Sequence, residues 1–192
     1  MSEYSVNIVV GLSGVGKGTV LEEAMMLSDE EYEVVNYGDR MFETAKERGL
    51  ADHRDEMKNI DTETYKEIQK GAAESIAEDA EDTNIIVETH AAIKSPFGYI
   101  PGLPKWVAEN LNPDKIIMLD ASSEAIYHRS QEADRDRDTE KAGIEGITEY
   151  RDTAKQMASA VSVLTGAYFQ IIENKDGQAE QAAEELVKTI RG

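Results

Sequence analysis

A glycine-rich stretch near the start of the chain has the residue types of a phosphate-binding loop. It contains G-x-x-x-x-G-K in full and reads Gly11-Leu12-Ser13-Gly14-Val15-Gly16-Lys17-Gly18-Thr19. The glycines let successive backbone N–H groups turn toward an anion, and the lysine can reach the β- and γ-phosphates of a nucleotide. An apolar run precedes the loop and a helical pattern follows it, which is the context that this chemistry requires. The stretch therefore predicts nucleotide binding rather than a structural glycine turn.

The loop also indicates where a metal ion would be held. The residue after Lys17 is Gly18, where most such loops carry Ser or Thr. We therefore expect the hydroxyl of Thr19, one position later, to bind the metal ion. Transfer of a γ-phosphoryl group also needs an acidic residue near Mg²⁺. Glu88 and Asp120 each end an apolar run, and either can act through water because Mg²⁺ keeps several waters. We favour Glu88, with Asp120 as the alternative, and capping a strand is the competing interpretation for both.

Three arginines lie close together in the sequence, at Arg129, Arg135 and Arg137. The last two belong to a run of alternating charge, residues 134–138. Such a run is usually a solvated surface, and surface ion pairs contribute little to stability. In a chain this acidic we favour a different interpretation. The arginines would lie on a loop that closes over ATP and supplies positive charge to the transition state.

The composition is that of one globular domain over residues 1–192, with 40% hydrophobic residues. The chain has no cysteine, which excludes disulfides, a thiolate nucleophile and cysteine-bound metals. His53, His90 and His128 share no metal-ligand spacing, and for His90 both packing and a role in the site stay open. No apolar run is long enough to cross a membrane, and the first expected strand leaves no room for a signal peptide. We therefore expect a cytoplasmic protein.

The formal net charge is −19, from 39 acidic and 20 basic residues. A polyanion would be repelled, so we expect neither nucleic acid nor an acidic membrane among the partners. A nucleotide must then be bound by local positive groups. Two interpretations of the charge stay open: adaptation to concentrated salt, which screens charges strongly, and an acidic surface that keeps the protein soluble.

Short β-branched runs alternate with helical patterns along the chain. The expected strands cover residues 5–10, 33–36, 84–88, 115–120 and 168–173, and the expected helices cover 17–28, 39–48, 62–81, 105–111, 124–129, 144–165 and 178–190. This alternation predicts an α/β fold with a parallel sheet covered on both faces and ligands at the carboxyl ends of the strands. One stripe of the helix at 144–165 is expected to pack in the core: Ile144, Ile147, Arg151, Ala154, Ala158 and Val161. Residues 94–104 hold three of the four prolines and are expected to form an irregular loop.

Several segments together resemble the archaeal adenylate kinases. They are the phosphate loop, whose Gly-Lys-Gly-Thr ending is typical of nucleoside monophosphate kinases, the strand end Val87-Glu88-Thr89-His90, and residues 36–43, 52–57, 93–104, 164–167 and 171–175. The resemblance covers nearly the whole chain. It implies a P-loop kinase core with a five-stranded parallel sheet, a helical AMP-binding region at about 37–80, a short lid at about 133–141, and a homotrimer.

The resemblance also implies an activity, which is reversible, Mg²⁺-dependent phosphoryl transfer from ATP to AMP, giving two ADP. The implied ATP-binding residues are 11–19, the implied catalytic residues Lys17, Arg129, Arg135 and Arg137, the implied metal residues Thr19 and Glu88 (the latter through water), and the implied AMP-binding residues Arg40, Arg54, Gln69 and His90. The chain departs from the bacterial enzymes, since their Asp-Gly-Phe-Pro-Arg run and long lid are absent. Glu88 also stands where the archaeal pattern more often has Asp.

Two other functions stay open from the residues alone. One is a kinase for another nucleoside monophosphate or a small metabolite. No general base stands out, which weakly favours a nucleotide or phosphate acceptor over an alcohol, because a phosphate is already an anionic nucleophile. The other is a nucleotide-dependent switch. Residues 174–177 resemble the guanine-reading Asn-Lys-x-Asp motif, but Gly177 replaces the carboxylate that would pair with guanine.

If the acidic surface is an adaptation to salt, the melting temperature and the activity should both rise as KCl increases from about 0.1 M to about 1 M, because screening weakens repulsion among the carboxylates. Thermal unfolding and the reaction rate across a KCl series check this. Unchanged or falling values would leave solubility as the explanation of the charge.

Overall fold

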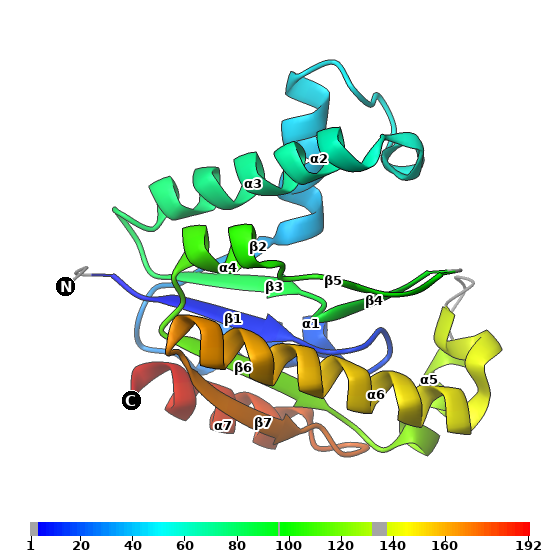
Figure 1. Ribbon diagram of the computed structural model, residues 1–192. Helices are drawn as coiled ribbons and strands as arrows, with labels where there is room; N and C mark the ends of the chain where they lie inside the picture. Colours follow the sequence, from blue (N-terminus) through cyan, green and yellow to red (C-terminus); the bar gives the residue numbers. More distant parts are fainter. Residues whose placement is uncertain (1–3, 96, 132–137) are drawn as a thin grey trace.

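Five parallel strands form the centre of the molecule (Figure 1). The computed structural model describes residues 4–95, 97–131 and 138–192. The strands lie in the order β2-β3-β1-β6-β7 across the sheet, and their bounds are β1 (Val6–Val10), β2 (Glu33–Asn36), β3 (Ile85–Thr89), β6 (Lys115–Asp120) and β7 (Tyr168–Glu173). Each begins and ends within one residue of the expected bounds, and every neighbouring pair is parallel. The expected five-stranded parallel sheet is confirmed.

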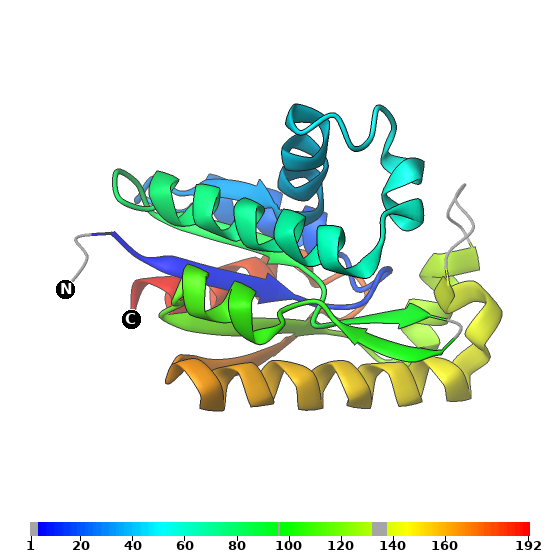
Figure 2. The ribbon, with the colours of Figure 1, turned by 45° about the horizontal axis from the view of Figure 1, so that its top comes forward.

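Helices cover both faces of this sheet. On one face, α1 (Lys17–Leu27) and α7 (Ala179–Arg191) pack against each other. On the other, α3 (Thr62–Asp79), α4 (Lys105–Leu111) and α6 (Asp138–Thr165) form a layer (Figure 2), and α5 (Ser123–Gln131) packs on α6. Because both faces are covered, the central strand β1 is buried at all of its positions. None of the described helices has the combination of length and apolar character that a bilayer span requires.

The long helix α6 is broken at Gly143, whose φ of 64° and ψ of 177° are not helical. The helix expected from residue 144 therefore starts just after the break. Beyond it, Ile147, Ala154, Ala158 and Val161 are buried, which confirms most of the expected core stripe. Ile144 departs from the stripe because it lies in the first turn after the break and is 42% exposed.

The region between β2 and β3 is helical and stands beyond the sheet (Figure 1). It consists of α2 (Tyr37–Glu47), a short 3₁₀ helix η1 (Arg54–Asn59) and α3. α2 begins two residues before the expected helix, and the Asn36 side chain accepts the Asp39 N–H at 3.1 Å as its cap. Asp61 caps α3 in the same way, accepting from Glu63 and Thr64. The 3₁₀ helix was not expected from the sequence, because a single short turn has no clear periodicity.

The expectation of an irregular loop at residues 94–104 was wrong. This part of the chain contains an antiparallel hairpin, β4 (Ala92–Ser95) and β5 (Gly98–Pro101). Pro101 is tolerated because it is the last residue of a strand in a two-stranded ribbon. Tyr150 on α6 anchors the ribbon, since its hydroxyl donates to Ala92 O at 3.0 Å and accepts from the Lys94 N–H at 3.3 Å.

The hairpin returns to the sheet through a very close backbone approach at Gly102. The Gly102 N–H donates to Ala91 O at 2.9 Å, and a Cβ at this position would lie 1.7 Å from His90 O. No side chain can be placed there without moving the backbone at the end of β3. The glycine is therefore required by space rather than by its dihedral angles.

We predict that Gly102→Ala lowers the free energy of unfolding by about 3 kcal/mol or more, because overpacking forces the backbone apart. Gly18→Ala is the matched control. A Cβ at Gly18 meets nothing within 4 Å and α1 is helical there, so stability should stay the same or rise slightly. Chemical denaturation of both variants measures the difference, and equal stabilities would contradict the close approach.

Candidate functional site

The phosphate-loop motif lies between the end of β1 and the start of α1, at the carboxyl edge of the sheet. Gly14 and Gly16 have positive φ values of 94° and 88°, so the loop turns through backbone conformations that side chains disfavour. Gly16 is also the residue before α1, and its carbonyl accepts the Val20 N–H at 3.1 Å. The expected strand, loop and helix are all present in this order.

Lys17 is buried inside this turn, with 7% of its surface exposed. Its Nζ donates to Gly11 O at 3.0 Å, so the side chain folds back across the loop from the first turn of α1. The Glu88 carboxylate lies 3.9 Å from the same nitrogen. A buried ammonium requires such partners, because an unpaired charge away from water is very costly. Lys17 thus sits where a phosphate held by the loop would meet its charge.

Glu88 comes from the neighbouring strand, in register with Val9 on one side and Asn36 on the other. The Asn36 Nδ2 donates to Glu88 Oε2 at 3.3 Å, which fixes the carboxylate beside Lys17. The Glu88 side chain is 23% exposed, so water or an ion can still reach it. Thr19 is exposed in the first turn of α1. Among the described residues, no cluster of three His, Cys, Asp or Glu side chains could hold a metal ion by itself.

Asp120, the alternative metal residue, has a different set of contacts. Its carboxylate accepts from Arg151 at both oxygens, Nε to Oδ1 at 2.8 Å and Nη2 to Oδ2 at 2.7 Å. This bidentate pair joins β6 to α6, and hydrogen bonding to Asp120 raises the pKa of the Arg151 guanidinium. The sequence patterns placed Arg151 in an apolar stripe and did not predict this pair. The geometry favours a structural role for Asp120.

His90 follows β3 and is partly buried. Burial, together with the nearby positive charge of Lys17, lowers the pKa of the imidazole to about 4. The ring is therefore neutral near pH 7 and can accept or donate a hydrogen bond without adding charge to the site. Its backbone is fixed by the close approach of Gly102.

Arg129 lies against the phosphate loop rather than away from it. Its Nη1 donates to Val15 O at 3.2 Å and to Gly14 O at 3.4 Å, and its Nη2 donates to Asn174 O at 3.2 Å. Asp176 holds the same guanidinium, with Nε to Oδ1 at 3.1 Å. The contacts with Asn174 and Asp176 were not predicted, because residues 171–175 were used only as part of the family resemblance and residues 174–177 only as an imperfect guanine-reading motif.

The two expected AMP-binding arginines, Arg54 and Arg40, have different contacts. Arg54, on η1, donates to Asp39 at the start of α2 and is 61% exposed. Arg40 instead points to α3, donating to Ser75 Oγ at 2.8 Å and Asp79 Oδ2 at 2.6 Å. Arg135 and Arg137, with most of the expected lid at 133–141, lie outside the described residues.

Gln69 is buried between helices at 5% exposure. Its side-chain oxygen accepts from Trp106 Nε1 on α4 at 3.3 Å, and its backbone oxygen accepts from the Tyr37 hydroxyl at 2.7 Å. Gln69 therefore joins α3 to both α4 and the start of α2. These contacts position the helical region relative to the sheet.

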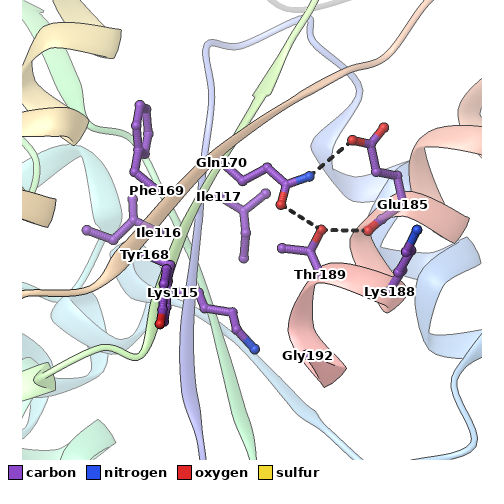
Figure 3. A pocket seen from close by; sticks show the side chains of 10 residues that line it. All are labelled: Lys115, Ile116, Ile117, Tyr168, Phe169, Gln170, Glu185, Lys188, Thr189 and Gly192. Atoms are coloured by element: carbon purple, nitrogen blue, oxygen red, sulfur yellow. Dashed lines mark hydrogen bonds between the residues drawn. The ribbon is translucent and has the colours of Figure 1, made fainter.

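A pocket of about 490 Å³ lies at the opposite edge of the sheet (Figure 3). It is lined by the first residues of β6 and β7 and by the last turns of α7: Lys115, Ile116, Ile117, Tyr168, Phe169, Gln170, Glu185, Lys188, Thr189 and Gly192. Several of its polar groups pair with one another. Thr189 Oγ1 donates to Gln170 Oε1 at 3.1 Å, and Gln170 Nε2 donates to Glu185 Oε1 at 3.1 Å. None of the expected site residues lines this pocket, so it is separate from the phosphate loop.

Known proteins similar to this chain match it over nearly its full length. A family model described as an AAA domain matches residues 10–148. An adenylate kinase of Methanococcus vannielii is 42% identical, over 97% of this chain and 98% of that protein. Adenylate kinases of Methanocaldococcus jannaschii and Methanopyrus kandleri are 43% and 45% identical, each over 96% of this chain and over 97% and 96% of those proteins. The chain belongs to the adenylate kinase family.

Solved structures agree with this family at the level of the fold. A shikimate kinase from Bacteroides thetaiotaomicron has a TM-score of 0.57 at 14% identity, over 98% of this chain and 99% of that chain. A shikimate kinase from Acinetobacter baumannii in complex with shikimate has a TM-score of 0.54 at 13% identity, over 99% and 94%. The likeness confirms the P-loop kinase fold that the sequence predicts.

The two acidic strand ends should respond differently to loss of charge. Glu88→Gln should slow Mg²⁺-dependent phosphoryl transfer by roughly ten- to a hundredfold, and it should also lower the melting temperature, because the buried Lys17 loses its charged partner. Asp120→Asn should cost about 2 kcal/mol of stability, because Arg151 loses a partly buried partner, and activity at low temperature should persist. Rates measured at a temperature where both variants are folded decide the roles. Lost activity in Asp120→Asn, with activity kept in Glu88→Gln, would make Asp120 the metal residue.

Proposed function

We propose that the protein is an adenylate kinase that transfers the γ-phosphoryl group of ATP to AMP, giving two ADP. The observation that carries the proposal is the buried Lys17 in its glycine loop, paired with Glu88 from the adjacent strand. The similarity to adenylate kinases of 42–45% identity over nearly full length supports the choice of acceptor. A kinase for another nucleoside monophosphate is the remaining alternative.

On the donor side, residues 11–19 would bind the phosphates of ATP. The loop's N–H groups and the start of α1 offer positive potential, and Lys17 adds a full charge. The catalytic effect of such groups is largest on the transition state, where negative charge spreads over the transferred phosphoryl oxygens. We infer that Arg129, with Arg135 and Arg137 of a lid at 133–141, completes this positive environment.

The chemistry of the site fits Mg²⁺ brought in with ATP. Glu88 is partly exposed beside Lys17, and one carboxylate with phosphate and water oxygens is a usual ligand set for this ion. We propose that Glu88, acting through water, and Thr19 hold it. When bound, the ion would neutralise negative charge on the phosphates of ATP.

On the acceptor side, the helical region at 37–80 would bind AMP. Arg54 has the contacts that support this role best, because its exposed guanidinium lies at the N-terminus of α2, where the helix dipole also favours an anion. Arg40 and Gln69 are also proposed residues of the AMP site. Their contacts would hold α2, α3 and α4 in place for AMP. His90, neutral near pH 7, would offer AMP a hydrogen bond without charge.

The mechanism needs no strong base on the protein. The AMP phosphate is already an anionic nucleophile, so the protein has to align it with the γ-phosphoryl group and neutralise charge.

We further propose one kinase domain over residues 1–192, which assembles as a homotrimer in the cytoplasm. The resemblance to the archaeal enzymes supports these last points.

Phosphoryl transfer from Mg·ATP to AMP, CMP, UMP and GMP, measured in parallel, tests the function. We expect rapid ADP formation with AMP alone. Lys17→Met should lower that rate by a hundredfold or more, on the order of the loss seen when one charge-stabilising group is removed. Transfer to another monophosphate would keep the donor site and change the acceptor, whereas ATP binding with no transfer would contradict the proposal.

A further inference from the structure

The loop between β7 and α7 lies directly against the phosphate loop. Asn174, the first residue after β7, is 4% exposed, and its Nδ2 donates to Val15 O at 2.8 Å. The contact is tight, because a Cβ at Gly16 would lie 2.6 Å from that nitrogen. The Asn174 backbone N–H donates to Asp120 O at 2.8 Å, so the side chain is held at the end of the sheet. Asn174 is thus a fixed donor aimed at one carbonyl of the phosphate loop.

Arg129 provides a second donor to the same carbonyl. Its Nη1 lies 3.2 Å from Val15 O, and its Nη2 donates to Asn174 O at 3.2 Å. The ion pair with Asp176 keeps the guanidinium in this place. The Val15 carbonyl therefore accepts from an amide and from a cation.

A carbonyl held in this way fixes the neighbouring N–H as well. The described residues contain no cis peptide, and in a trans peptide the C=O of one residue and the N–H of the next point in opposite directions. Val15 C=O and Gly16 N–H belong to the same peptide group. Donors on the carbonyl also polarise the peptide and make its N–H a stronger donor.

We propose that Asn174 is a positioning residue for phosphate binding: by holding the Val15 carbonyl, it turns the Gly16 N–H toward the bound phosphates. This inference rests on the proposed function, because it assigns a role within the same ATP site. It extends the site to a loop that comes more than 150 residues later in the sequence, since Asn174 and Val15 are 159 positions apart.

The surroundings of the Asn174 side-chain oxygen, Oδ1, support a role for Asn174 beyond stability. Asn174 Oδ1 is buried without a hydrogen-bond partner among the described residues. A buried, unpaired acceptor is unfavourable, so a residue selected only to fill this space would be apolar. The amide at this position is explained by its Nδ2 donor, which bonds to Val15 O.

Two variants remove the donor in different ways. Asn174→Asp keeps the shape but places an oxygen against the Val15 carbonyl, and Asn174→Ala removes the group. Asn7→Ala is the matched control, because Asn7 is also a fully buried asparagine with an unpartnered Oδ1, and its Nδ2 bonds to Ser5 at the other end of β1. Binding of Mg·ATP and of inorganic tripolyphosphate is measured by calorimetry, with unfolding temperatures and the ¹⁵N–¹H signal of Gly16.

We expect both Asn174 variants to bind Mg·ATP and tripolyphosphate about tenfold more weakly, as for the loss of one hydrogen bond. The Gly16 amide shift on tripolyphosphate binding should shrink, and the KM for AMP should stay unchanged. The control should bind both ligands like the wild type, whatever its unfolding temperature.

Folded Asn174 variants with wild-type affinity would overturn the inference. So would a control that loses affinity equally, because general destabilisation would then explain the effect. The proposed function fails separately, if the wild type binds Mg·ATP but transfers no phosphate to AMP. In that case the Asn174 contact is still judged by the binding data alone.

Discussion

The buried ammonium of Lys17 is the constraint on which the site depends. A cation with 7% of its surface exposed must be paired, and here the Gly11 carbonyl and the Glu88 carboxylate are its partners. Each partner sets a further requirement. Gly11 lies within reach only because the loop turns back on itself through Gly14 and Gly16 at positive φ. Glu88 lies within reach only because β3 is adjacent to β1 in parallel register, with Val9 opposite Glu88.

The same geometry separates the roles of the two acidic strand ends. Both end apolar strands next to β1 and both face the carboxyl edge, so their positions in the sequence cannot distinguish them. Their partners can. Glu88 lies between a lysine and an amide and stays 23% exposed, whereas both oxygens of Asp120 are taken up by Arg151. The second carboxylate fastens α6, which in turn carries Tyr150 and anchors the hairpin.

The features that could be predicted from the sequence are those that depend on patterns of neighbouring residues. The phosphate loop, the five strands, the strand-end position of Glu88 and the stripe on α6 all follow from residues that lie close together in the chain. The hairpin did not, because proline argues against a strand unless the strand is known to be short and at an edge. The Arg151–Asp120 pair and the Asn174–Val15 contact join residues 31 and 159 positions apart, and no periodicity signals such contacts. Asn174 entered the sequence analysis through a family resemblance and through a motif for a different ligand, and neither indicated its contact with the phosphate loop.

An anion site and a net charge of −19 are compatible because they act over different distances. The acidic surface repels a nucleotide at long range, and dissolved salt screens this repulsion at separations beyond about 10 Å at 0.1 M and beyond about 3 Å at 1 M. The groups that would bind phosphate act in contact and are partly shielded from solvent, so salt screens them much less. Nearby acids also hold the positive groups in place, as Asp176 holds Arg129 and Asp39 holds Arg54. Acidic residues near the site therefore orient its cations, while those on the remaining surface set the long-range field.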